Sequence, residues 1–353
     1  MFTQTLTRRV LRSNLVDLLT GPHGVDRYTE LVTPTWSLSD ARAKVVSVRR
    51  RTPRSVTLTL APNAACSDVW AGFTAGQHVN VTVEIDGRRH TRCYSPANAQ
   101  GESLIELTVS RHDGGLVSTY LQRNATPGMV VGLDGVGGDF VLPPARPRRI
   151  LFVAGGSGIT PVMSMLRTLT GENFSGDVAV IHYARSPEEA CYRDELAATP
   201  GVRVLYGFTR SGDGDFRGRF DAAHLAAAMP SPDAVYVCGP TALAEAVREQ
   251  CDNVSAESFT PPVFEAASPR GGRIMFSDSG VHCADDGRPI LDQAETAGLA
   301  PASGCRMGIC HTCTRRKTRG TVKNLITGAM STPDDQDVLI CVSVPVGDVD
   351  IAL

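Results

Sequence analysis

Four cysteines near the C-terminus have the residue type and spacing that could carry redox chemistry. Three lie on one short segment in the pattern C-x4-C-x2-C, and the fourth follows farther along: Cys305, Cys310, Cys313 and Cys341. Four thiolates at this spacing are typical ligands of a 2Fe-2S cluster, with three ligands on one loop and the fourth from elsewhere. The spacing therefore predicts a protein that moves single electrons.

Structural zinc and ordinary buried thiols are the alternatives for these cysteines. Zinc sites usually have two short C-x2-C pairs, whereas this segment has one. Gly304 and Gly308 lie beside and between the cysteines. Glycine lets backbone N–H groups approach the sulfurs, and such hydrogen bonds tune the potential of a cluster. We therefore favour iron over zinc.

Length and charge limit the remaining classes. The 353 residues predict two or three domains, since one domain usually has about 100 to 200. A net charge of −2 with 20% charged residues argues against binding to nucleic acid or to an acidic membrane surface. The N-terminal residues lack an apolar signal core, and no apolar run reaches transmembrane length. These features predict a reducing cytoplasm, with any membrane association through a partner.

Hydrophobic patterning divides the chain into four predicted parts. Residues 1–40 form an extension with a short amphipathic pattern, either a packing segment or a helix that docks on a membrane or partner. Residues 41–145 alternate with period two, which favours an antiparallel β-barrel. Residues 146–262 alternate apolar runs with helical stretches, one of them at 162–169, which indicates a parallel α/β sheet. Residues 263–353 are the compact part with the cysteines.

Two segments of the predicted barrel could bind a flavin. Arg92-Cys93-Tyr94-Ser95 offers a guanidinium for phosphate, a ring for stacking and a hydroxyl for a ring nitrogen. The segment 114–121 combines two glycines with a serine at a helix start, which could bind a pyrophosphate. A hairpin turn capped by serine is the alternative.

Two segments of the predicted α/β part follow apolar strands. The loop 155–161 reads G-G-S-G-I-T-P, which is neither G-x-G-x-x-G nor a P-loop, yet strand, glycine turn and helix still form a nucleotide cradle. The segment Cys238-Gly239-Pro240 ends another strand, where ligands of open α/β sheets bind. A buried structural thiol is the alternative for Cys238.

With these motifs in this order, the chain from about residue 43 to 353 resembles the ferredoxin–NADP reductase superfamily. It is most similar to reductases with a C-terminal plant-type ferredoxin domain, such as those like phthalate dioxygenase reductase and phenylacetyl-CoA epoxidase reductase. The resemblance implies a multidomain fold: an antiparallel β-barrel flavin domain, an α/β parallel-sheet nicotinamide-nucleotide domain and an α+β β-grasp ferredoxin domain. It implies an NAD(P)H:acceptor oxidoreductase with FAD, NADPH and a 2Fe-2S cluster.

The resemblance also implies roles for individual residues. Ser95, near flavin N5, and Cys238, beside the nicotinamide, are the catalytic candidates. The flavin candidates are Arg92, Tyr94, Ser95, Gly114, Gly115, Val117 and Ser118, with Glu257 and Phe259 near the ring. The nicotinamide candidates are Gly155, Gly156, Gly158, Thr160, Pro161, Cys238, Gly239 and Pro240. Because Pro96 to Ala99 depart from the usual Ser/Thr-rich continuation, FMN stays open, although FAD is favoured.

NADPH is favoured over NADH because the 2′-phosphate needs cations where NADH needs a carboxylate. Arg185, Ser186 and Arg193 follow the second predicted strand of the α/β part, and no acidic residue occupies that strand end. Glu188 and Glu189 follow closely, so NADH stays open. Solvated loop arginines are the alternative.

The sequence shows no Rieske ligand pair, no histidine boxes and no evident haem-thiolate segment. The terminal acceptor is therefore expected to be a separate protein. Residues 22–28 resemble actinobacterial reductases, some of them associated with fatty acyl-CoA desaturases, which favours a desaturase. A Rieske oxygenase, a di-iron hydroxylase or a P450 is the alternative acceptor, and a non-enzymatic redox sensor or a zinc-stabilised module is the alternative class.

Overall fold

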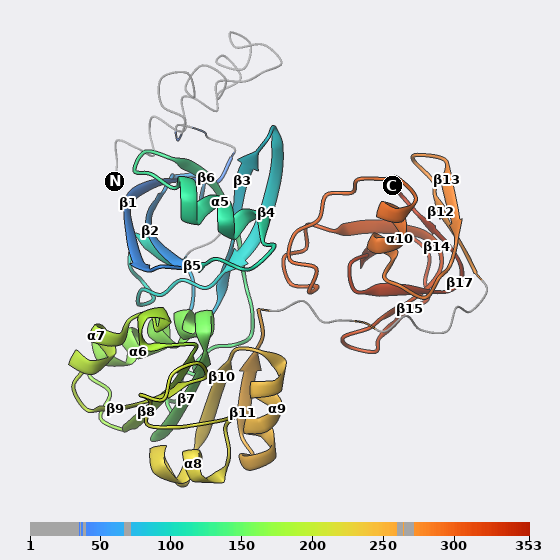
Figure 1. Ribbon diagram of the computed structural model, residues 1–353. Coiled ribbons are helices and arrows are strands. Elements are labelled where there is room, and N and C mark those ends of the chain that lie inside the picture. The colour runs from blue at the N-terminus through green and yellow to red at the C-terminus, as the bar shows by residue number, and fades with distance from the viewer. Residues whose placement is uncertain (1–34, 36, 38–39, 67–71, 260–263, 265–271) are drawn as a thin grey trace. The chain divides into compact units, whose positions relative to one another are not determined.

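The computed structural model describes residues 35, 37, 40–66, 72–259, 264 and 272–353 (Figure 1). Most of the predicted extension, including its amphipathic pattern, lies outside the described residues. The chain divides into two compact units. The first holds an antiparallel and a parallel sheet, and the second holds one mixed sheet. No helix in the described ranges is both long enough and apolar enough to cross a membrane.

The first sheet forms the predicted barrel. Its elements are β1 (Arg42–Thr52), β2 (Ser55–Pro62), β3 (His78–Ile85), β4 (Arg88–Tyr94), β5 (Ile105–Ser110), α5 (Leu116–Asn124) and β6 (Val130–Gly137). The strand order is β4-β3-β6-β1-β2-β5. The alternation in β3 is confirmed, because Val79, Val81, Val83 and Ile85 are all buried in the barrel core. Asp86 and Gly87, both with positive φ, form the tight turn from β3 to β4.

The second sheet is parallel, as its apolar runs predicted. Its elements are β7 (Arg149–Gly155), η2 (Gly156–Gly158), α6 (Ile159–Gly171), β8 (Asp177–Ala184), η3 (Pro187–Glu189), α7 (Arg193–Ala198), β9 (Val202–Phe208), α8 (Ala222–Ala228), β10 (Ala234–Cys238), α9 (Thr241–Gln250) and β11 (Val254–Glu257). The strand order is β11-β10-β7-β8-β9. Residues of α6 and α7 pack with one buried cluster of this sheet, and residues of α8 and α9 with another. The order reverses between β7 and β10, and a reversal of this kind is where such sheets bind ligands.

Helix α6 begins earlier than the predicted start at residue 162. It begins at Ile159, directly after η2, and includes Pro161 in its first turn. Proline is tolerated there because the first N–H groups of a helix have no partner within the helix. The loop between β7 and α6 is therefore shorter than predicted, and the N-terminus of α6 directly follows the last glycine, Gly158.

The second unit contains the third sheet. Its elements are β12 (Arg273–Phe276), β13 (Val281–Ala284), α10 (Ile290–Thr296), β14 (Thr314–Asn324), β15 (Met330–Ser331), β16 (Gln336–Leu339) and β17 (Ser343–Ile351). The order is β13-β12-β17-β14-β15, with β16 beside β14. Only β12 and β17 are parallel among the described pairs of this sheet. Ile290, Leu291 and Ala294 of α10 pack into its core.

Candidate functional site

The end of strand β4 positions the predicted flavin contacts. Tyr94 ends the strand and packs against the barrel core. Ser95 follows it and is buried, and its Oγ has no hydrogen-bond partner within the described structure. A buried hydroxyl without a partner is costly, so such an atom commonly indicates an absent ligand. The site therefore fits a flavin that accepts or donates a hydrogen bond at Ser95.

The glycine pair before α5 forms a turn. Gly114 has a φ of +76°, and Gly115 is the N-cap residue of α5. Ser118 Oγ accepts a hydrogen bond from the backbone N–H of His112 at 3.1 Å, so this hydroxyl already supports the turn. Val117 is buried in the barrel core, which leaves only its backbone for a phosphate. Pyrophosphate binding at these residues stays a prediction.

Two glycine segments meet at the reversal point of the parallel sheet. A Cβ on Gly158 would lie 2.0 Å from the carbonyl oxygen of Cys238, and a Cβ on Gly155 would lie 2.8 Å from Pro240 Cδ. Only glycine permits this approach of backbone to backbone. Gly156 has a φ of +57° and nothing within 4 Å of a Cβ position, so among the three glycines of this loop it leaves open space. Thr160 Oγ1 donates to the carbonyl of Ser157 at 3.1 Å and stabilises the loop.

The thiol of Cys238 lies beside the carboxylate of Glu257. The two residues are register partners on β10 and β11, and Cys238 Sγ lies 4.0 Å from Glu257 Oε2. Burial, and then the charge of Glu257, raise the pKa of Cys238 well above its ordinary value. The thiol is therefore protonated at neutral pH. A protonated thiol is a poor nucleophile, so Cys238 would contribute a small, uncharged surface at the predicted nicotinamide position.

His78 is a further residue near Glu257 that no sequence motif indicates. This buried residue on β3 has its Nδ1 at 3.9 Å from Glu257 Oε1, and Nδ1 has no hydrogen-bond partner among the described residues. Its ring packs against Gly137 and Gly138, where Cβ atoms would lie 3.2 and 3.1 Å from the ring nitrogens. His78 belongs to a strand recognised by its valines, and no local motif indicates that it faces β11. Only the tertiary structure places it beside Glu257.

The three residues predicted to select NADPH lie after β8 and at the start of α7. Arg185 Nη1 lies 3.8 Å from Glu189 Oε2, so one predicted cation already has an acidic neighbour. The Arg193 guanidinium carbon lies 5.7 Å from the ring centre of Tyr206. Ser186 precedes the short helix η3. Phe259, the other aromatic candidate, packs against the core around α6 and β7.

The four candidate ligands in the second unit are all buried. Backbone N–H groups point at the sulfurs of the loop: Cys305 N lies 3.2 Å from Cys310 Sγ, and Met307 N and Cys310 N each lie 3.3 Å from Cys305 Sγ. The thiol of Cys313 is hydrogen-bonded to that of Cys341, and this bond lowers the pKa of Cys313. The fourth sulfur is thus brought to the loop.

The cluster loop, defined as residues 304–313, is shaped by unusual backbone angles. Arg306, Gly308 and His311 have φ values of +56°, +75° and +58°. A Cβ on Gly304 would lie 2.7 Å from Cys310 Sγ, so this glycine leaves the space that the sulfur needs. Thiolate donors, donated N–H groups and a glycine at the sulfur together fit a 2Fe-2S cluster.

Comparison with known proteins defines the class. The chain matches the oxidoreductase FAD-binding domain at residues 64–142, the oxidoreductase NAD-binding domain at 152–249 and the 2Fe-2S iron-sulfur cluster binding domain at 275–346. The chain therefore belongs to the ferredoxin–NADP reductase superfamily, among the flavin reductases with a C-terminal 2Fe-2S domain. It is an NAD(P)H oxidoreductase that uses FAD and a 2Fe-2S cluster.

Individual relatives agree with this class. The NADPH oxidoreductase of Mycobacterium tuberculosis is 34% identical over 94% of this chain and 89% of its own length. A glycine betaine monooxygenase reductase subunit of Pseudomonas aeruginosa is 30% identical over 78% of this chain and 86% of its own. The solved structure of phthalate dioxygenase reductase, described as modular for electron transfer from pyridine nucleotides to 2Fe-2S, covers 88% of this chain and 97% of its own at 25% identity, with a TM-score of 0.59.

The residues of the chain prepare the chemistry of these cofactors. Bound flavin supplies the conversion of a hydride into single electrons, and a bound cluster supplies a one-electron relay. The buried Ser95 hydroxyl, which has no partner among the described residues, would hydrogen-bond to a bound flavin. Cys238 and the glycines at the ends of β7 and β10 are the residues predicted to line the nicotinamide position. The thiols of the cluster loop and Cys341 would hold the cluster, and the backbone N–H groups that point at the sulfurs would tune its potential.

Proposed function

We propose that this chain is an NADPH-dependent reductase that delivers electrons to a separate oxygen-activating protein, and that this acceptor is a fatty acyl-CoA desaturase. The observation that carries the proposal is the combination of three redox modules in one chain with a complete set of cluster cysteines. Such a chain ends in a one-electron donor, which needs a protein acceptor.

Relatives support an oxygen-activating acceptor. The Pseudomonas relative is named as a reductase subunit of a monooxygenase, and another relative is a subunit of phenoxybenzoate dioxygenase. Both names favour an oxygenase as the second candidate acceptor. The choice of a desaturase rests on the resemblance of residues 22–28 to actinobacterial reductases, and a mycobacterial relative covers nearly the whole chain. Association with a membrane would then occur through the desaturase.

The preference for NADPH rests on Arg185, Ser186 and Arg193 and on the name of the mycobacterial relative. Arg193 lies over Tyr206, where a cation is held beside an aromatic face. Its guanidinium can bind a phosphate with a rigid fork of donors. We expect Arg193→Ala to lower kcat/KM for NADPH by about tenfold and to leave kcat/KM for NADH within about twofold. Equal losses with both nucleotides would contradict the role of Arg193 in selectivity.

The acceptor is tested by reconstitution. The purified holoenzyme and NADPH are combined with one acceptor at a time: an acyl-CoA desaturase in membranes, a Rieske oxygenase or a P450. The amount of product formed per NADPH oxidised is measured for each acceptor. The proposal predicts close coupling with the desaturase and weak coupling with the others. Tight coupling to the Rieske oxygenase, with none to the desaturase, would identify the second candidate instead.

A further inference from the structure

One face of helix α6 reaches the segment of the flavin barrel that follows Ser95. Three side chains of α6, at the i, i+3 and i+4 spacing of a helix face, bond to the backbone of residues 97–100. The bonds run from Ser164 Oγ to the Asn98 carbonyl (2.7 Å), from Arg167 Nη1 to the Ala97 carbonyl (2.7 Å) and from the Gln100 amide to Thr168 Oγ1 (3.1 Å). The helix is therefore fixed to the barrel through main-chain atoms, whose position does not depend on a rotamer.

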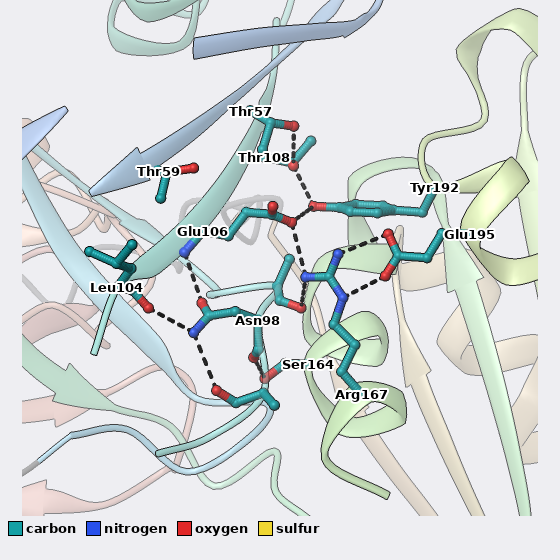
Figure 2. Close-up of polar contacts among 12 residues, drawn as sticks. Thr57, Thr59, Asn98, Leu104, Glu106, Thr108, Ser164, Arg167, Tyr192 and Glu195 are labelled. Atoms are coloured by element: carbon teal, nitrogen blue, oxygen red, sulfur yellow. Dashed lines mark hydrogen bonds and ion pairs between the residues drawn. The ribbon is translucent and has the colours of Figure 1, made fainter. Parts of the chain in front are cut away.

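Arg167 is the centre of this contact (Figure 2). Its Nε and Nη2 donate to the two carboxylate oxygens of Glu195 on α7, at 2.6 and 2.9 Å. Its Nη1, which also bonds to the Ala97 carbonyl, donates to Glu106 Oε1 on β5 at 3.0 Å. The guanidinium thus joins helices α6 and α7 to the barrel. The side chain of Glu106 is 11% exposed and that of Arg167 22%, so water screens their pairing only weakly.

Further side chains hold Glu106 in place. Tyr192 Oη donates to Glu106 Oε1 at 3.2 Å and also hydrogen-bonds to Thr108 (Figure 2). Arg49 Nη2 donates to Glu106 Oε2 at 2.7 Å. The Glu106 N–H donates to Asn98 Oδ1 at 2.8 Å, which ties β5 back to the same barrel segment. Because Arg167 and Tyr192 each have further partners, rotation of the Glu106 side chain would leave several polar groups without partners.

The contact lies between the two segments predicted to hold the reacting groups. Helix α6 begins at Ile159, directly after the glycine loop at the end of β7. Residues 97–100 follow Ser95 after Pro96 alone, and the Ser95 hydroxyl is buried without a partner among the described residues. A shift of α6 along the barrel would therefore move the nicotinamide loop relative to Ser95. Hydride transfer is sensitive to such a shift, because a displacement of about 1 Å can cost about a hundredfold in rate.

We propose that Arg167 is a positioning residue for hydride transfer: its bonds to Ala97, Glu106 and Glu195 fix the nicotinamide loop relative to the flavin site. Arg167 does not touch the reacting atoms and acts through α6. The proposal uses the NAD(P)H:flavin reaction of this class and does not depend on the identity of the acceptor.

Lysine at this position separates charge from geometry. Arg167→Lys keeps a cation between the two carboxylates but loses the planar fork, so it cannot bond to Glu195 bidentately and reach Ala97 as well. Arg167→Met removes the cation that the buried Glu106 and the partly exposed Glu195 share. Among the described residues, Glu106 is then left with only Arg49 and Arg51 of the barrel as ion-pair partners. The matched control is Arg146→Lys. Arg146 binds Glu172, the C-cap residue of α6, with a similar fork, at 3.0 and 2.7 Å, and has no described bond to residues 97–106.

The test measures hydride transfer apart from later steps. Flavin-loaded wild type and variants are mixed anaerobically with NADPH or NADH, whichever the wild type oxidises faster, in a stopped-flow instrument. The limiting rate of flavin reduction, the apparent Kd of the nucleotide and the isotope effect with nucleotide deuterated at C4 are recorded. Amide hydrogen exchange of residues 97–106 and 159–171 is measured without nucleotide, and dithionite reduction verifies flavin loading.

We expect Arg167→Lys to lower the limiting rate by about tenfold and Arg167→Met by about a hundredfold, with the apparent Kd within about threefold. The isotope effect should change and exchange should increase in both segments, whereas Arg146→Lys should match the wild type. A limiting rate and isotope effect unchanged in Arg167→Lys, with only a lower Tm, would overturn the proposal. If Arg167→Met does not fold, the test uses Arg167→Lys and Ser164→Ala. Limiting rates equal to the wild type in both variants would overturn the positioning role of Arg167.

Discussion

The cluster loop and the contact between α6 and the flavin barrel hold their reacting groups in different ways. In the cluster loop, backbone N–H groups and glycines within ten residues shape the site. At the contact, side chains from β5, α6 and α7 meet from segments far apart in the sequence. A site built within one loop can therefore be recognised from a sequence motif, whereas a site built between layers is visible only in the fold.

The largest effect is expected in the cluster loop. Cys310→Ser removes a ligand, so we expect reduction of cytochrome c or of a protein acceptor to fall by more than about a hundredfold, while NAD(P)H reduces the flavin at a rate within about twofold of wild type. Stopped-flow absorbance and iron analysis measure the two effects. Equal loss of both reactions would contradict a separation between the cluster loop and the hydride site.

A large effect is also expected where the β7 and β10 loops touch. Gly158→Val places a side chain where a Cβ alone would lie 2.0 Å from the Cys238 carbonyl oxygen. We expect a loss of about 1–3 kcal/mol or more in stability. Flavin reduction by nucleotide should slow by at least about tenfold. The control is Gly171→Ala at the end of α6, where a Cβ meets nothing within 4 Å, and stability should rise by up to about 1 kcal/mol. A Gly158→Val variant with wild-type unfolding and kinetics would refute this packing.

Sequence patterns anticipated one of these two regions much better than the other. The spacing of Cys305 to Cys341 predicts the ligands because three of them are local. Period-two alternation predicts the strands of the barrel, but on β5 the polar residues Glu106 and Thr108 lie on a face that is buried against Tyr192 and not exposed to solvent. Period-two alternation cannot distinguish a polar face in water from one in a contact between sheets. His78 was missed for the same reason.

The stability of the fold should depend on pH through His182, which contacts the predicted nicotinamide loop at Gly156. His182 is fully buried on β8, and its Nε2 lies 3.3 Å from the Gly156 carbonyl oxygen. Burial lowers the pKa of His182 to about 4, while the hydrogen bond to Gly156 opposes the shift. The unfolded chain therefore binds the proton first as pH falls. The contribution of neutral His182 to the free energy of unfolding is complete above about pH 6.5 and is lost progressively toward about pH 4.

This shift corresponds to about 2 kcal/mol lost between about pH 7.5 and pH 5. Urea unfolding at both pH values measures it in the wild type and in His182→Gln, which keeps a donor but does not titrate. We expect the loss of stability to be smaller in the variant by about this amount. An identical pH dependence in both proteins would show that His182 is charged or exposed in the fold.

The smallest effect is expected for Glu195→Gln. Glu195 pairs with Arg167 within the parallel-sheet layer, and its side chain is 35% exposed. The bonds of Arg167 to Ala97 and Glu106 remain in this variant. We expect a loss of about 1 kcal/mol or less and a limiting rate of flavin reduction within about threefold of wild type. Thermal unfolding and stopped-flow kinetics measure both, and a rate loss as large as that of Arg167→Met would shift the positioning role to Glu195.

The most direct test of the account compares Arg167→Lys and Cys310→Ser in one stopped-flow experiment with nucleotide and a protein acceptor. The account predicts opposite patterns. Arg167→Lys should slow flavin reduction by about tenfold and leave delivery from prereduced protein unchanged, and Cys310→Ser should abolish delivery and leave flavin reduction unchanged. If both variants slowed the same step, the two regions would not serve separate steps, and the account would be wrong.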